Sequence, residues 1–134
     1  MSDGSELDKA LAAFSQTFST GDGDGFLALF TDDAEVLLHE QPKLVGTAAI
    51  REMFIELFAT IDTSEFEIDY DVVDIHGDRA YVLAAFRETL QPKAEGPAIV
   101  IDGRIVCFWQ QEPDKEWKVT RVLTGRAGPD CIRP

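Results

Sequence analysis

The hydrophobic period of the chain changes within residues 47–73, which read TAAIREMFIELFATIDTSEFEIDYDVV. The first half has apolar residues three and four positions apart, at Ile50, Met53, Phe54, Leu57, Phe58 and Ile61. This spacing predicts an amphipathic helix, with Thr47 as its N-cap. In the second half apolar residues alternate with acidic ones, at Phe66, Ile68, Tyr70 and Val72. Alternation predicts a β-strand, so a helix is followed by a strand here.

Two further helices are predicted upstream of this stretch. The first follows a capping box at Ser5 and Asp8, ends at Gly21, and has its apolar residues at helical spacing: Leu7, Ala10, Leu11, Phe14 and Phe18. Asp22 or Asp24 caps a short second helix, which carries Phe26, Leu29 and Phe30 and ends at Asp32-Asp33. The apolar run from Ala34 to Leu38 predicts a short strand.

Downstream, the pattern predicts an antiparallel meander. The apolar phase shifts at Val73, which indicates a bulge, and Gly77-Asp78 is a hairpin turn. Further strands are predicted over residues 79–89, 98–111 and 117–124. The predicted fold class is therefore α+β, with a curved antiparallel or mixed sheet wrapped as a cone around three N-terminal helices. We expect one domain over residues 1–134, with a core over about 7–124 and a loose tail over 125–134.

The charge of the chain excludes several kinds of partner. Its 134 residues include 12 basic and 25 acidic ones, a net charge of −13. Nucleic acids and anionic membranes both require a positive protein surface, so neither is an expected partner. The chain contains no apolar run of roughly 18 residues, the length of a membrane span. Its polar, acidic start lacks the features of a signal peptide, so we expect a cytoplasmic protein.

Four segments resemble the nuclear transport factor 2-like superfamily, which includes ketosteroid isomerase and the SnoaL-like polyketide cyclases. They are the helix–Gly-Asp–helix–Asp-Asp-Ala entry over residues 18–34, Gly46–Phe54, the hairpin Gly77–Val82, and Trp117–Val119. The resemblance covers roughly residues 7–123. It implies a cone-shaped fold around an apolar pocket for a small apolar ligand. It also implies a homodimer formed through the outer face of the sheet.

The resemblance does not extend to the catalytic groups of ketosteroid isomerases. The position of their first-helix tyrosine is Phe14 here, and that of their general-base aspartate is Leu38. The region of their second oxyanion donor, residues 105–107, has no carboxylate. Because enolisation needs a base and a stabiliser of the negative charge, ketosteroid isomerase activity is not expected.

Other ionisable residues are candidates for acid–base chemistry at the mouth of the expected pocket. They are His39, Glu40, Tyr70, Arg87 and Glu88. We single out Glu40 and His39 as the catalytic candidates, because strand alternation places Glu40 inward if Leu38 points inward. The predicted pocket-lining residues are aromatic or apolar: Phe14, Phe18, Phe30, Leu38, Phe54, Phe58, Cys107, Trp109 and Trp117. With two histidines far apart in sequence, neither a metal nor another cofactor is expected.

Two functions remain open at the level of the sequence. One is an acid–base isomerase, cyclase or hydrolase acting on an apolar or polyketide-like molecule. The other is a non-catalytic ligand-binding or dimerisation module. The apolar residues on both faces of the strand around Val106 and Phe108 are typical of a sheet covered on both sides, which supports a homodimer.

Overall fold

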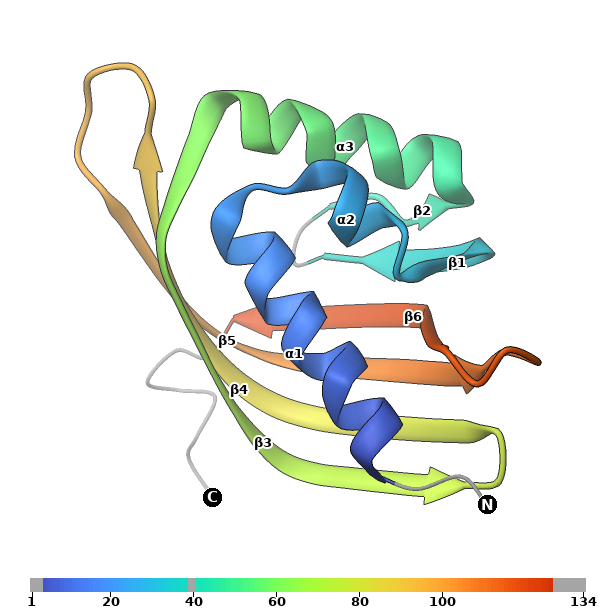
Figure 1. Ribbon diagram of the computed structural model, residues 1–134. Helices are drawn as coiled ribbons and strands as arrows, with labels where there is room; N and C mark the ends of the chain where they lie inside the picture. Colours follow the sequence, from blue (N-terminus) through green and yellow to red (C-terminus); the bar gives the residue numbers. More distant parts are fainter. Residues whose placement is uncertain (1–3, 39–40, 127–134) are drawn as a thin grey trace.

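Within residues 4–38 and 41–126, which the computed structural model describes, three helices lie against one face of a curved six-stranded sheet (Figure 1). In chain order the elements are α1 (Gly4–Thr20), α2 (Gly23–Leu27), β1 (Phe30–Leu37), β2 (Leu44–Val45), α3 (Thr47–Thr60), β3 (Ile61–His76), β4 (Arg79–Pro92), β5 (Ile99–Gln111) and β6 (Trp117–Arg126). The predicted α+β class is confirmed, and β1 and β2 lie between α2 and α3 in the chain.

The sheet is mixed. Its strand order is β2-β1-β6-β5-β4-β3, and β1 pairs with β6 in parallel while every other described pairing is antiparallel. The predicted bulge is present, because the register between β3 and β4 shifts between Tyr70 and Val72. The long strands bend around α1 (Figure 1), so the inner face of the sheet and the helices enclose the core.

The first two helices are joined by a turn whose residue types can be recognised in the sequence. Gly21 follows α1 with a positive φ of 72°, a conformation that favours glycine. The Asp22 carboxylate then accepts a hydrogen bond of 3.0 Å from the backbone N–H of Gly25 and caps α2. Of the two predicted caps, Asp22 is the one used.

The expected length of α2 is wrong. The helix was expected to run to Asp32-Asp33, but it ends at Leu27, and Phe30 already belongs to β1. The reason is strand pairing, because the Leu29 carbonyl accepts a 2.7 Å hydrogen bond from Val119 N–H and Phe30 lies opposite Val119 of β6. A partner almost ninety residues away thus overrides the local helical spacing.

The predicted N-cap of α3 is also wrong. Gly46, with a φ of 89°, occupies the N-cap position and makes no side-chain cap bond. Thr47 is the first helical residue, and its hydroxyl donates instead to the Asp32 carbonyl at 3.2 Å. This bond ties the start of α3 to β1. At its other end α3 passes directly into β3 at Ile61.

Two strands extend beyond their predicted ends. β4 continues to Pro92 because Ile61 at the start of β3 lies opposite it. β6 continues to Arg126 because Gly103 of β5 lies opposite that residue. Positions 125 and 126, assigned to the tail, are therefore strand, and 127–134 lie outside the described residues.

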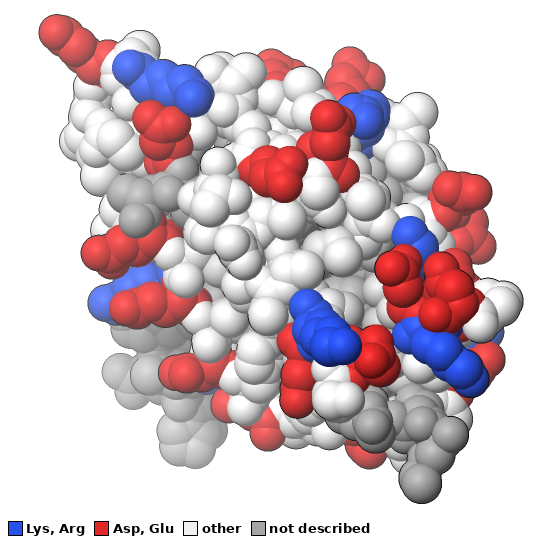
Figure 2. All heavy atoms as spheres, in the orientation of Figure 1, with Lys and Arg blue, Asp and Glu red and all other residues white. Residues whose placement is uncertain are grey.

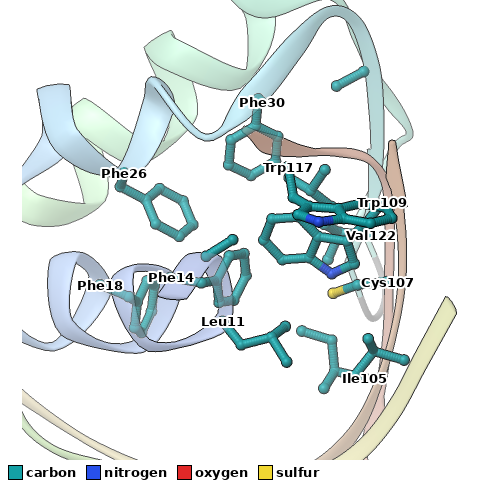
Figure 3. Packing of buried hydrophobic residues seen from close by; sticks show 14 of the residues in the cluster. Leu11, Phe14, Phe18, Phe26, Phe30, Ile105, Cys107, Trp109, Trp117 and Val122 are labelled. Carbon is teal, nitrogen blue, oxygen red and sulfur yellow. The ribbon is translucent and has the colours of Figure 1, made fainter. Parts of the chain in front are cut away.

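Aromatic rings from the helices fill much of the space against the sheet. Phe14 and Phe18 of α1 both contact Phe26 of α2, with ring centroids 5.1 and 5.6 Å apart, and Phe54 of α3 lies 4.9 Å from Phe26. Figure 3 shows Phe14, Phe18 and Phe26 on one side of the two indoles of the sheet, and the Phe14 ring centroid lies 6.0 Å from that of Trp109. Such tilted and edge-to-face contacts stabilise the core beyond the area they bury.

On the face drawn in Figure 2, acidic side chains lie in several separate groups, some of them beside basic side chains. Many carboxylates have a basic neighbour. In the pair of Arg51 and Asp24, for example, Nη2 and Oδ1 are 3.0 Å apart. No described helix is both long and apolar enough to cross a membrane.

Candidate functional site

The helices and the inner face of the sheet surround a cavity of about 600 Å³. This volume lies within the range of roughly 300–1,000 Å³ that ligand pockets occupy. Helices α1, α2 and α3 contribute apolar side chains on one side, and strands β1, β3, β4, β5 and β6 line the other. The cavity is a place where a small apolar molecule can be removed from water.

Five of the predicted pocket residues line this cavity: Phe14, Phe18, Phe30, Leu38 and Phe54. The other four do not. Phe58 packs against Phe18 with a centroid distance of 5.6 Å. Cys107, Trp109 and Trp117 are buried in the core (Figure 3), where they serve as packing rather than as wall. Helical spacing and strand alternation found the inward residues, but neither pattern could separate those facing the void from those in contact with other side chains.

Few polar side chains reach the wall. Within the described residues they are Gln41, Glu88, Thr124 and Arg126. Gln41 precedes β2, Glu88 is on β4, and the other two are at the end of β6. The register aligns Gly103 of β5 with both Phe86 of β4 and Arg126 of β6, so Glu88 and Arg126 belong to the same end of the sheet.

Glu88 is an acidic residue at an inward strand position. On β4 the even-numbered residues face the core, and Ala80, Val82, Ala84 and Leu90 are all buried. Glu88 continues this series, with Phe66 of β3 and Ile101 of β5 as its cross-strand neighbours. Its carboxyl has no hydrogen-bond or ion-pair partner among residues 4–38 and 41–126.

This environment changes the acidity of the group. Burial raises the pKa of Glu88 from 4.5 to about 7, because an apolar wall disfavours the charged carboxylate. A carboxyl with such a pKa exists in both protonation states at neutral pH. It can therefore donate a proton in one state and accept a proton in the other.

Gly103 makes room for one ring of the cavity wall. A Cβ at this position would lie 2.6 Å from the Phe86 ring and 2.7 Å from the Gly125 carbonyl oxygen. Phe86 lines the cavity beside Phe66, with ring centroids 6.2 Å apart. The missing side chain of Gly103 thus lets the Phe86 ring lie close to β5, two residues from Glu88.

The two catalytic candidates singled out from the sequence, His39 and Glu40, lie outside the described residues. Of the remaining acid–base candidates, Tyr70 is not part of the cavity wall. Arg87 points to the outer face and binds Asp102, with Nε and Oδ1 2.7 Å apart. Glu88 is the candidate that the structure brings to the cavity, and the alternation Ala84, Phe86, Glu88, Leu90 was the signal that could have ranked it higher.

Two other kinds of chemistry find little support in the described residues. Burial raises the pKa of Cys107 to about 12, so this thiol stays protonated at neutral pH and is a poor nucleophile. Among residues 4–38 and 41–126, no three His, Cys, Asp or Glu side chains lie close enough together to hold a metal ion.

Two of the positions that differ from ketosteroid isomerases in the sequence resemblance face the cavity, and so does the first residue of the region 105–107. Phe14, Leu38 and Ile105 are all part of its wall. None of them carries a group that can take a proton or donate a hydrogen bond. These three positions therefore contribute apolar side chains to the wall.

Comparison with known proteins places the chain in a family. Residues 11–120 match the model of the SnoaL-like domain. No curated protein matches the chain. A ketosteroid isomerase-like protein from Erwinia carotovora atroseptica is similar in structure, with 21% identity, a TM-score of 0.83, and coverage of 93% of this chain and 96% of that one.

Two similar structures come from Novosphingobium aromaticivorans. One is a proposed aromatic ring hydroxylase, 26% identical, with a TM-score of 0.77 and coverage of 92% of this chain and 87% of that one. The other is a proposed scytalone dehydratase, 17% identical, with a TM-score of 0.78 and coverage of 91% and 82%. Their different names show that the shared fold does not determine one activity. The match over residues 11–120 and the shared architecture show that this chain belongs to the SnoaL-like domain family, within the nuclear transport factor 2-like fold.

Proposed function

We propose that the chain is an acid–base enzyme, an isomerase, cyclase or hydrolase, that acts on a small, largely apolar or polyketide-like molecule held in the cavity. The observation that carries the proposal is the apolar cavity of about 600 Å³ with an ionisable carboxyl, Glu88, in its wall. Removal of water from such a site strengthens the hydrogen bonds inside it and prevents solvent from competing for the transferred proton. The names of the similar isomerase-like and dehydratase proteins support acid–base chemistry as the reaction type.

Ketosteroid isomerisation is not the proposed reaction. Phe14, Leu38 and Ile105 provide neither the base nor the oxyanion donors that it requires.

A non-catalytic ligand-binding module is the alternative. It is favoured by the small number of ionisable groups in the described wall, which are Glu88 and Arg126. The two functions share the cavity and differ in whether a bound molecule is converted. Native mass spectrometry of the purified protein detects a bound molecule, and analysis of the released molecule identifies it. A turnover assay with this molecule then compares the wild type with Glu88→Gln.

The cavity itself is tested by filling it. Leu57 of α3 lines the cavity, so Leu57→Trp is expected to weaken binding of the neutral fluorescent probe N-phenyl-1-naphthylamine about tenfold or more. Ile55→Trp is the matched control, because Ile55 lies on the same helix, is exposed and does not line the cavity. Equal loss of binding in both variants, or in neither, contradicts a ligand site in the cavity.

A further inference from the structure

The wall of the cavity contains a carboxyl group whose neighbours are apolar. Phe66 and Ile101 flank Glu88 on the adjacent strands, and Phe86 and Leu90 are the next inward residues on its own strand. All four line the cavity with it. Any ligand that fills this end of the cavity therefore touches the carboxyl.

A ligand in this position changes the water around Glu88. In the empty cavity, solvent can reach the carboxyl, which is only partly buried. An apolar ligand displaces that solvent, and a carboxylate without a partner is then strongly disfavoured. The protonated acid has one O–H donor, and this donor needs an acceptor on the ligand.

We propose that Glu88 binds its ligand in the protonated form and selects neutral, mainly apolar molecules that carry a carbonyl oxygen. This inference rests on the proposed function, since it assigns the ligand class of the same cavity. The carbonyl oxygen accepts the Glu88 O–H bond while the remainder of the molecule contacts the aromatic wall. Above neutral pH the protein takes up one proton from solvent for each ligand bound.

The charged groups around Glu88 determine which other residue could orient the ligand. On its own strand and the next, Arg87 and Asp102 pair with each other at 2.7 Å on the outer face, and Glu67 of β3 is exposed opposite Arg87. From β6, Arg126 is the other charged residue of the described wall. If Arg126 rather than Glu88 orients the ligand, the preferred ligand is an anion.

Three bicyclic probes of similar size separate these cases: tetralin, 1-tetralone and tetralin-1-carboxylate. Isothermal titration calorimetry at pH values of about 6 and about 8, in two buffers of different ionisation enthalpy, measures affinity and proton uptake together. The wild type is expected to bind 1-tetralone more tightly than tetralin at the lower pH. The tetralone affinity should fall about tenfold per pH unit above 7, with uptake of close to one proton at the higher pH.

Variants of Glu88 supply the decisive comparison. Glu88→Gln keeps an N–H donor, so it should retain the preference for the ketone but lose both the pH dependence and the proton uptake. Glu88→Leu should also lose the preference. Glu67→Gln, which removes a charge from the exposed neighbour, should behave as the wild type. Circular dichroism verifies that each variant is folded.

The outcomes distinguish this inference from the proposed function. If Leu57→Trp blocks tetralin binding, the cavity is a ligand site. If 1-tetralone binding then takes up equally many protons in the wild type and in Glu88→Gln, the role of Glu88 is overturned while the ligand site remains. Tighter binding of the carboxylate than of the ketone at both pH values also overturns it. Failure of all three probes to bind contradicts the inference and the proposed function together.

Discussion

A carboxyl group in an apolar wall makes the stability of the protein depend on pH. The pKa of Glu88 is about 7 in the folded protein and 4.5 in its ordinary state, which is also that of the unfolded chain. Between these values the folded state holds more protons than the unfolded state. The contribution of Glu88 to the free energy of unfolding therefore decreases as the pH rises from 4.5 to 7.

Glu88→Gln is expected to remove this decrease. The variant and the wild type should have similar free energies of unfolding near pH 4, where both side chains are neutral. Above pH 7 the variant should be more stable by up to about 3 kcal/mol, which is the free-energy equivalent of the raised pKa. Urea denaturation across this pH range measures the difference between the two curves. Parallel curves for the two proteins would show that Glu88 ionises as it does in water.

Gly103 is a second position at which one residue shapes the wall. Gly103→Ala places a methyl group 2.6 Å from the Phe86 ring and 2.7 Å from the backbone oxygen of Gly125, and the backbone cannot move aside easily. We expect a loss of about 1–3 kcal/mol in the free energy of unfolding, as for other overpacked sites. Gly125→Ala is the control, since a Cβ there meets nothing within 4 Å. Equal stability of the two variants would contradict the steric role of Gly103.

At the scale of elements, the connection from β2 into α3 depends on one backbone conformation. Gly46 has a φ of 89° and donates its N–H to the Ala34 carbonyl at 2.9 Å, while Thr47 binds the Asp32 carbonyl. A Cβ at residue 46 would have room, so the cost of Gly46→Ala is that of the backbone conformation itself, about 1–3 kcal/mol. Thr47→Ala removes a single hydrogen bond, about 1 kcal/mol.

Chemical denaturation of both variants checks this difference. A larger loss for Thr47→Ala than for Gly46→Ala would restore Thr47 as the important residue at the start of α3. The sequence suggested that role, because threonine before an apolar helical run is a good N-cap. The structure assigns the cap to Gly46, whose positive φ of 89° is a backbone conformation that favours glycine over threonine.

Other elements show the same division between local and distant causes. The position of α1 is predicted correctly by the helical spacing of its apolar residues and by the glycine that follows it. The end of α2 does not, because Phe30 has both helical spacing and a pairing partner in β6, and the hydrogen bond to the distant strand decides the outcome. Elements whose partners lie close in sequence, such as the hairpin at Gly77-Asp78, were predicted correctly.

At the scale of the whole molecule, the outer face of the sheet carries a continuous apolar row. Cross-strand pairing aligns Val72, Leu83, Val106, Leu123 and Leu37 across β3, β4, β5, β6 and β1. Four of the five are exposed, and Phe108 beside them is 43% exposed. Apolar surface of this extent is typical of a protein interface. The homodimer expected from the sequence remains a prediction, and this row is where we place it.

Leu123→Lys is expected to convert that dimer into a monomer, because two charged ammonium groups would be buried near the centre of a two-fold interface. Size-exclusion chromatography with light scattering at micromolar concentration measures the mass. Val45→Lys, at an exposed apolar residue of β2 outside the row, should leave the dimer intact. A monomeric wild type would contradict the prediction.

Residue order alone determined the class of the fold, the positions of most elements and the inward-facing aromatic residues, because hydrophobic period and turn residues act over short distances. Only the tertiary structure decided which inward residues border a void. It excludes Phe58, Cys107, Trp109 and Trp117 from the cavity wall and adds Glu88 to it. The physical reason is that a void is a property of several elements packed together. The raised pKa of Glu88 has the same origin, since apolar neighbours from two other strands surround it.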